Sequence, residues 1–571
     1  MSQDKSFRYI FRIAPASFVF MAAMGLLNGL VGLLVTYATG KLFSVIDCGN
    51  ISSIYAALFE YGALLILSEL YVVWYMHYHV QFHSVLRFEG KVRTILHNKS
   101  SSISNEQLES PYVFSQIKRA EGCRHHLFRY AQIRIELVTM LCSAGLITGY
   151  ISAMNIWFLV VLPIAIIPIA LRSLVKSNIL DRNYYRLLTF KKQEKELGRI
   201  LSDERYISEN RISGADSILI EKYMSVRAER LKMEEEQSRV QLKINIATSI
   251  FECLGLVGGF LISVLLYHRH LISVTELTAG VAAYSFLSSM VKAVSSSIAN
   301  GAIYKKMISP YFEFIDIQER SGKEIGISFE KSIELRNVSF RYPVNDETSI
   351  ENVNLHINKG EVIAIVGENG SGKTTLVNVI LGLYEPSNGC VLYDDKDIRV
   401  FEEPDVHLRQ STVSQNFIRY KLSVKDNIRI GNFSKRDDQY IEEGIQNCLS
   451  AKVSGDTMLG KELGGVELSG GEWQQLAILR GFYKDSAIIV LDEPTSAIDP
   501  LKEKALYDEF HEKLKGKTGI IITHRLSSIA LADRIIVMKD GCIIESGTHE
   551  KLLSISGEYT KLWNAQCSMF N

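Results

Sequence analysis

The chain has 571 residues, which is too long for one ordinary hydrophobic core and predicts two or three structural units. Its formal net charge of +0 argues against a nucleic-acid-binding protein, because such domains carry a basic excess. The 8 cysteines are scattered without a CxxC pair, so we expect reduced cytoplasmic thiols rather than a disulfide framework or a zinc site.

Long apolar stretches dominate the first half of the chain. The first of them, residues 13–37, contains no charged residue and is long enough to cross about 30 Å of hydrocarbon as a helix. It is also too long for the core of a signal peptide. Similar stretches follow, so we expect an all-α domain of six transmembrane helices, at residues 13–37, 55–79, 133–153, 156–175, 244–267 and 272–291.

Basic residues orient these helices in the membrane. They precede the first stretch and follow the second, and such residues favour the cytoplasmic side, so we expect a multi-pass membrane protein with a cytoplasmic N-terminus. The two inner connections, of roughly 50 and 65 residues, carry charges at helical spacing and predict membrane helices that continue into the cytoplasm. The basic residues concerned are Lys5, Arg8, Arg12, Arg87, Lys91, Arg93, Lys118 and Arg119.

The last apolar stretch carries a polar stripe at helical spacing. Two interpretations stay open: the stripe faces a wet pathway for substrate, or its hydroxyls bond to neighbouring helices and to their own backbone. The residues of the stripe are Thr278, Ser285, Ser288, Ser289, Lys292, Ser295 and Ser296.

Other polar residues occur in or beside the apolar stretches. Glu60 and Glu69 lie on opposite faces of the second stretch, because nine residues turn through about 900°. For these two and for Glu252, substrate contact and helix pairing both stay open. His79 and His83 are four residues apart and could ligate zinc, but without an evident third ligand we expect an interfacial role.

From residue 321 the pattern changes to short apolar strands and glycine turns, so we expect a membrane domain at 1–320 and an α/β P-loop nucleotide-binding domain at 321–571. The buried-strand run 362–366 leads into GENGSGKTT, which matches the phosphate-loop pattern with a strand before it and a helix after it. Glycines let the backbone wrap a polyphosphate, the lysine reaches the β- and γ-oxygens, and the first threonine ligates Mg²⁺. The expected ATP-binding residues are Gly367, Asn369, Gly370, Ser371, Gly372, Lys373, Thr374 and Thr375.

A second apolar run, residues 487–491, ends in two carboxylates. This is the pattern of a Walker B strand, in which Asp492 holds the Mg²⁺ and Glu493 is the base for the attacking water. A solvated acidic turn would explain the run if it stood alone. The phosphate loop in the same chain favours the catalytic interpretation.

The order of these motifs resembles the ATP-binding-cassette transporter family, and the six stretches ahead of them resemble its exporter-type half-transporters. The resemblance implies that Tyr342 stacks on adenine, that Gln415 senses the metal and the nucleophile, and that His524 contacts the γ-phosphate. The segment LSGGEWQQ resembles the family signature, whose phosphate contacts would be Ser469, Gly470 and Gly471, and residues 496–499 resemble the D-loop. Glu472 and Ile498 depart from the family pattern, where glutamine and leucine are usual.

The family resemblance also implies a partner. In this family the signature closes over the ATP of a second cassette, and this chain has one phosphate loop and one signature. We therefore expect a head-to-tail dimer in the lipid membrane, with a second copy favoured over a related half-transporter because the motif residues are intact. Two segments, 107–118 and 207–223, resemble the loops that couple the cassettes to the membrane helices.

The function expected from the resemblance is ATP-driven export, by alternating access, of an amphipathic substrate such as a peptide, a lipid or a drug-like molecule. Two segments, ESPYVFSQIKRA and WQQLAILRGF, loosely resemble sequences of the lantibiotic and peptide exporter subgroup. Two alternatives stay open. One is an inward-working lipid or siderophore transporter, and the other is an ATP-gated regulator or channel, against which Glu493 and His524 argue.

Overall fold

The computed structural model describes residues 3–71, 83–156, 187, 189–320, 329–343, 347–449, 453–494, 500–523 and 529–568. The chain divides into two compact units. The first comprises Met1–Asn98 and Gln116–Asp316, and the second comprises Lys99–Ser115 and Ile317–Asn571.

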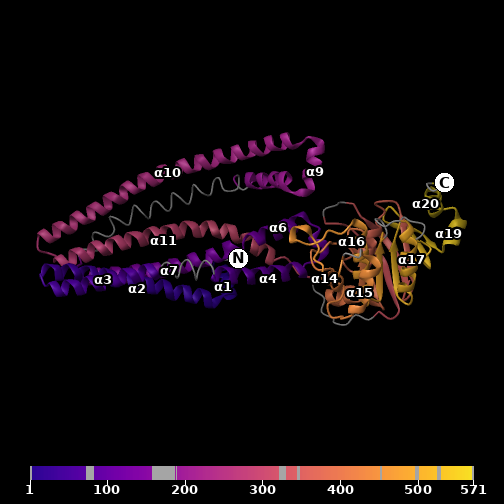
Figure 1. Ribbon diagram of the computed structural model, residues 1–571, viewed down its shortest axis with the longest axis horizontal. Helices are drawn as coiled ribbons and strands as arrows, with labels where there is room; N and C mark the ends of the chain where they lie inside the picture. The colour runs from indigo at the N-terminus through magenta and orange to yellow at the C-terminus, as the bar shows by residue number, and fades with distance from the viewer. Residues whose placement is uncertain are drawn as a thin grey trace. The chain divides into compact units, whose positions relative to one another are not determined.

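The first unit is helical. Helix α2 (Pro15–Asp47) contacts α3 (Ile51–Tyr71), α7 (Arg124–Met154) and α11 (Val274–Ile315), and these four helices run side by side in Figure 1. Helix α11 begins with a capping box in which Ser273 and Glu276 satisfy each other's backbone N–H groups. The remaining helices associated with this unit are α1 (Gln3–Ile13), α4 (Val85–Ser102), α6 (Pro111–Gly122), α9 (Glu204–Ser213) and α10 (Asp216–His268).

Close packing joins α2 to α7. A Cβ atom on Gly25 would lie 2.7 Å from the Thr139 hydroxyl oxygen, and one on Gly29 would overlap Ser143. The two glycines and their two partners are each four residues apart, so small residues face small residues along one stripe of each helix. This is the way in which helices approach closely in a membrane.

Four of the described helices are long and apolar enough to cross a membrane: Pro15–Asp47, Ile51–Leu70, Arg124–Met154 and Val274–Ile315. They contain the predicted third stretch, all but the first two residues of the first and sixth stretches, and most of the second. The predicted stretch 156–175 lies almost entirely outside the described residues. The stretch 244–267 is helical but forms the end of α10, whose 53 residues extend about 80 Å and therefore exceed a bilayer. The helical domain is confirmed, and the count of six stays a prediction.

The second unit contains two sheets. Strands in the order β2-β1-β4-β5 form an antiparallel sheet, and strands in the order β10-β9-β3-β8-β7-β6 form a sheet that is parallel except at β10. This architecture confirms the predicted α/β domain. The strands are β1 (Ser332–Phe340), β2 (Ile350–Asn358), β3 (Val362–Gly367), β4 (Asn388–Tyr393), β5 (Lys396–Asp397), β6 (Gln410–Val413), β7 (Ile488–Asp492), β8 (Thr518–Ile522), β9 (Arg534–Lys539) and β10 (Cys542–Gly547).

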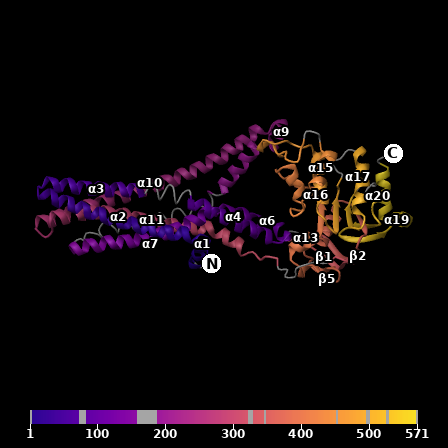
Figure 2. The same ribbon diagram turned by 60° about the horizontal axis from the view of Figure 1, so that its bottom comes forward.

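The core of the second unit forms where the sheets and helices meet. Every residue of β3 is buried, as expected for a central parallel strand that is covered on both faces. Helices lie beside the parallel sheet, as Figure 2 shows for α16 and α17. The helices are α5 (Asn105–Leu108), α12 (Lys373–Ile380), α13 (Glu403–Leu408), α14 (Val424–Arg429), α15 (Asp438–Cys448), α16 (Gly470–Tyr483), α17 (Pro500–Leu514), α19 (His549–Ile555) and α20 (Glu558–Cys567), with short 3-10 turns at Ile398–Val400 and Lys461–Leu463.

The segment Lys99–Ser115 belongs to the second unit through specific contacts. The hydroxyl of Tyr384 donates a hydrogen bond of 2.7 Å to the Glu109 carboxylate, and Lys99 pairs with Glu319 at 2.9 Å. The Tyr384 ring also lies against Phe340, with centroids 5.1 Å apart and nearly parallel planes. This segment contains the beginning of the predicted coupling loop 107–118, so part of that loop is tied to the cassette.

Candidate nucleotide-binding site

The site begins where β3 gives way to α12. Gly370 and Gly372 have φ angles of +85° and +95°, which L-residues rarely adopt. A Cβ atom on Gly372 would lie only 2.7 Å from the backbone oxygen of Ser349, so the turn needs glycine there for two reasons. The buried hydroxyl of Ser371 has no hydrogen-bond partner within the described chain. An unsatisfied buried hydroxyl in a glycine-rich turn fits an anion as the missing partner.

Lys373 is held over the phosphate loop. Its ammonium group donates to the backbone oxygens of Gly367 at 2.9 Å and of Glu368 at 2.8 Å, and only 7% of the residue is exposed. Burial lowers the pKa of this lysine, while Glu493 and Asp492 raise it. The charge is thus already positioned, and phosphate oxygens would provide the anionic partners that it lacks in the loop.

Carboxylates and an amide meet at the end of β7. Glu493 has a φ of +47°, a strained conformation for a residue with a side chain, immediately after the last residue of β7. The Gln415 amide donates to the Glu493 carboxylate at 2.6 Å. Burial, with a contribution from Glu493, raises the pKa of Asp492 to about 6, and Lys373 opposes this shift.

The raised pKa of Asp492 predicts that its ionised carboxylate lowers the stability of the fold, although we expect ATP hydrolysis to require that carboxylate. Because the folded protein binds the proton more tightly than the unfolded chain, the ionised Asp492 destabilises the nucleotide-free protein above pH 6, and acidification from 6 towards 4 relieves the cost. We expect Asp492→Asn to raise the free energy of unfolding at pH 7.5 by on the order of 1 kcal/mol, after allowance for solvent screening. It should also abolish Mg²⁺-dependent ATP hydrolysis.

Thermal unfolding of the two proteins in lipid nanodiscs without nucleotide, at pH 7.5 and 5, checks this prediction. The difference between them should shrink at pH 5. Glu347→Gln, which neutralises a carboxylate of the same cleft, is the control and should change the midpoint less. If the unfolding midpoint of Asp492→Asn at pH 7.5 is lower than that of the wild type, the ionised Asp492 does not destabilise the fold and the prediction is wrong.

Tyr342 closes another side of the site. Its hydroxyl lies 3.0 Å from the Thr375 hydroxyl, which belongs to the first turn of α12. Its ring makes edge contacts with Phe340 and Tyr384, at centroid distances of 5.1 and 5.6 Å. The ring is therefore held by aromatic neighbours beside the phosphate loop, where a nucleotide base could reach it.

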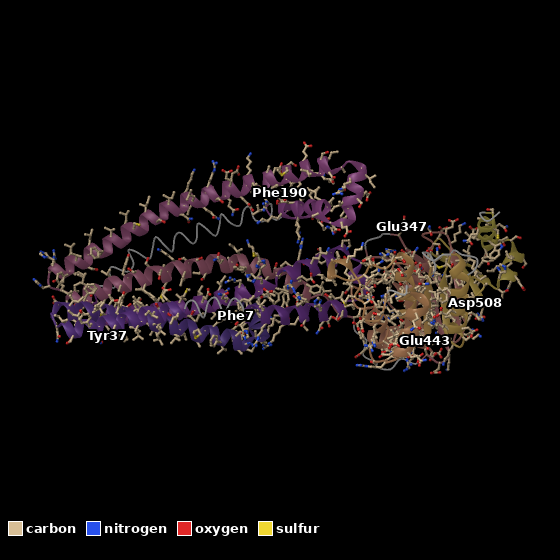
Figure 3. The ribbon with its side chains drawn as sticks, viewed as in Figure 1. Phe7, Tyr37, Phe190, Glu347, Glu443 and Asp508 are labelled. Carbon is tan, nitrogen blue, oxygen red and sulfur yellow. The ribbon has the colours of Figure 1, made fainter. Side chains whose placement is uncertain are left out.

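These residues line one cleft of about 590 Å³. Ten of the predicted site residues take part: Tyr342, Asn369, Gly370, Gly372, Lys373, Thr374, Thr375, Gln415, Asp492 and Glu493. The cleft is also lined by residues that the sequence did not reveal, namely Glu347, labelled in Figure 3, together with Thr348, Ser349, Ile522, Asp540 and Gly541. An Asp-Gly pair predicts a turn, here between β9 and β10, but not its place beside a phosphate loop.

The predicted signature residues lie elsewhere. Ser469, Gly470 and Gly471 form the start of α16 and are not among the residues that line the cleft in the described part of the chain. His524 and the predicted D-loop at 496–499 lie outside the described residues. The same helix does reach Glu493 about one turn after its start: the buried Gln474 amide lies 3.5 Å from the backbone oxygen of Glu493, a link that the sequence did not predict.

Three comparisons with known proteins identify the family. Residues 350–496 match the family model described as ABC transporter. The chain is 26% identical to the subtilin transport ATP-binding protein SpaT of Bacillus subtilis, over 98% of this chain and 93% of that protein. It is 30% identical to the ATP-dependent lipid A-core flippase of Escherichia coli strain K12, over 66% of this chain and 67% of the flippase. The chain belongs to the ABC transporter family.

The fold of this ABC transporter agrees with the sequence comparison. It is similar to the structure of a bacterial Atm1-family ABC exporter with ATP bound, with a TM-score of 0.77 and 20% identity, over 96% of this chain and 98% of that one. The exporter-type half-transporter expected from the motifs is confirmed. The transporter is thus an integral membrane protein whose cassette binds ATP and couples ATP hydrolysis to transport.

The structure also places the polar residues of the membrane helices. In α11, the hydroxyls of Thr278, Ser285 and Ser289 donate to backbone oxygens of their own helix. These bonds favour the packing interpretation for the three hydroxyls, although Ser285 and Ser289 stay exposed in the single chain. Ser288 and Ser295 are buried, and Ser296 accepts a hydrogen bond from Asn300.

The structure places two acidic residues of the predicted membrane stretches in different environments. Glu60 forms an ion pair of 2.6 Å with Lys41, so it joins α3 to α2. Glu69 is exposed. His79 and the side chain of Glu252 lie outside what the structure describes. Among the described residues, no group of three His, Cys, Asp or Glu side chains could hold a metal ion.

Proposed function

We propose that this ABC transporter exports an amphipathic molecule, a peptide, a lipid or a drug-like compound, from the cytoplasm, with ATP and Mg²⁺ bound between two copies of the chain. One observation supports ATP binding between two copies. The phosphate loop, Gln415, Asp492 and Glu493 line one cleft, whereas the signature helix begins outside it. Two relatives, a subtilin transport protein and a lipid A-core flippase, support an amphipathic substrate.

The proposed roles follow from the chemistry of each group. Lys373 and the backbone of Gly370–Gly372 would bind the β- and γ-phosphates, and Tyr342 would stack on adenine. Thr374, Gln415 and Asp492 offer oxygen ligands, which Mg²⁺ prefers, and these three residues would hold the ion. Glu493 would accept the proton of the attacking water. The chemistry that Mg²⁺ would supply when bound is neutralisation of the charge that develops on the phosphates during hydrolysis.

A second copy also fits the surface of the first unit. The membrane end of α10 exposes one apolar face, and Figures 1 and 2 show that this helix meets α11 at their hairpin and diverges from it. Lipid or a partner helix must cover such a face in the membrane, and two-fold dimers are the commonest assembly. The exposed residues are Ile246, Ile250, Leu254, Val257, Leu261 and Leu265. We propose a homodimer with cytoplasmic cassettes.

The test uses the chain purified alone and placed in lipid nanodiscs and in vesicles. We expect a particle of two chains with ATPase activity, and ATP-dependent movement of a fluorescent amphipathic peptide or lipid into inside-out vesicles. Lys373→Ala should stop the movement, because it removes the main cation for the phosphates. An inactive single-chain particle would contradict the homodimer, and ATP turnover without movement of either probe would contradict the substrate class.

A further inference from the structure

The start of the signature helix already holds an anion of its own. The backbone N–H of Ser469 donates to the Glu472 carboxylate at 2.9 Å, and the Ser469 hydroxyl donates to the same carboxylate oxygen at 2.8 Å. In return, the backbone N–H of Glu472 donates to the Ser469 oxygen at 3.3 Å. A serine hydroxyl has one proton, and here that proton is directed to Glu472.

Part of this arrangement is ordinary helix capping. The same box of serine and glutamate starts α11, at Ser273 and Glu276, where no phosphate chemistry is proposed. Capping alone therefore explains why a glutamate is stable at this position. It does not decide what happens when a phosphate approaches, and at α16 the proposed function requires such an approach.

We propose that Glu472 is a positioning residue whose carboxylate occupies the phosphate position at the signature and so sets the ATP concentration at which two cassettes close. This inference rests on the proposed shared site. The γ-phosphate of the second copy's ATP needs the single proton of the Ser469 hydroxyl and the positive end of α16. Glu472 uses both while the cassette is open, and two anions at one helix terminus repel each other.

Closure then requires an exchange of partners. Glu472 turns away from Ser469, and the Ser469 hydroxyl keeps its proton but donates its hydrogen bond to a phosphate oxygen instead of to the carboxylate. The helix start stays partly capped meanwhile, because the Ser469 oxygen still accepts from the backbone N–H of Glu472. The free energy needed to displace Glu472 opposes closure of the cassettes and not cleavage of the phosphate bond. It should therefore raise KM for ATP more than it lowers kcat.

Glu472→Gln tests the proposal. A glutamine has the same shape, and its amide oxygen can accept from Ser469, but it carries no charge that opposes a phosphate. We expect the ATP concentration for half-maximal ATPase activity to fall by about tenfold, the change that corresponds to one charged hydrogen bond, with a smaller effect on kcat. In a Glu493→Gln background, the same substitution should lower the ATP concentration needed to cross-link closed dimers.

Glu467→Gln is the matched control. Glu467 is an exposed carboxylate two residues before Ser469, and its oxygen accepts from the Trp473 indole at 3.4 Å, a bond that glutamine can keep. This variant should leave KM for ATP near the wild-type value. An unchanged KM in Glu472→Gln, or an equal shift in Glu467→Gln, would overturn the proposal.

One further variant separates this inference from the proposed function. Ser469→Arg should abolish ATPase activity if the signature serves a second copy's ATP. Full activity of Ser469→Arg would refute the shared site itself. An inactive Ser469→Arg together with an unshifted Glu472→Gln would leave the shared site standing and refute only the role of Glu472.

Discussion

Glu493→Gln is expected to lower the ATP turnover of this transporter by about 10²- to 10⁴-fold, the usual contribution of a general base, while ATP binding stays nearly unchanged. The substitution keeps the shape of the side chain and removes its ability to accept a proton. In the structure the carboxylate is already oriented, because the Gln415 amide donates to it at 2.6 Å and its backbone is in a left-handed conformation. Loss of chemistry without loss of binding should leave the two cassettes closed over ATP.

Single-turnover hydrolysis and equilibrium binding of radiolabelled ATP measure the two effects separately. Asp540→Asn is the matched control, since Asp540 also lines the cleft and sits in a turn that accepts asparagine. It should retain ATPase activity. Turnover at the wild-type rate in Glu493→Gln would show that another group accepts the proton, and a loss of binding would show that Glu493 has a structural role instead.

Contiguous motifs were predictable and contacts between distant segments were not. The phosphate loop is continuous, so its pattern places Lys373 and Thr374 at the start of a helix without knowledge of the fold, and the structure agrees. The hydrogen bond from Gln415 to Glu493 joins residues 78 apart in the chain, and it depends on the parallel pairing of β6 with β7. The order in which strands pair cannot be predicted from any single segment of the sequence. The sequence therefore predicted both residues but not the hydrogen bond between them.

The membrane half shows the same division. Apolar length alone identifies α2, α3, α7 and α11, because the bilayer sets a minimum length for a spanning helix. The ends of these helices depend on packing and on capping, so α10 extends over 53 residues, while only its last part reads as a membrane stretch. The same limit applies to Glu472: the sequence shows a departure from the family pattern, and the carboxylate's hold on Ser469 appears only in the folded helix.

Dimers that combine a Ser469→Arg chain with a Lys373→Ala chain are expected to recover ATPase activity that neither variant has alone. If the signature of one copy completes the phosphate loop of the other, the mixed dimer contains one intact site and one doubly defective site. Its rate should then approach about half the wild-type value when the two sites act independently, and should be lower but measurable when they are coupled. Two affinity tags on co-expressed chains isolate the mixed dimer for the measurement.

The reciprocal dimer makes the result decisive. A wild-type chain paired with a chain that carries both substitutions contains the same two changes, and yet under the shared arrangement each of its sites has one defective component. That dimer should be inactive. If each signature instead served the phosphate loop of its own chain, the outcomes would exchange, with the wild-type and double-variant pair active and the Ser469→Arg and Lys373→Ala pair silent. Composition, expression and membrane environment are identical in the two dimers, so only the connection between Ser469 and Lys373 distinguishes them.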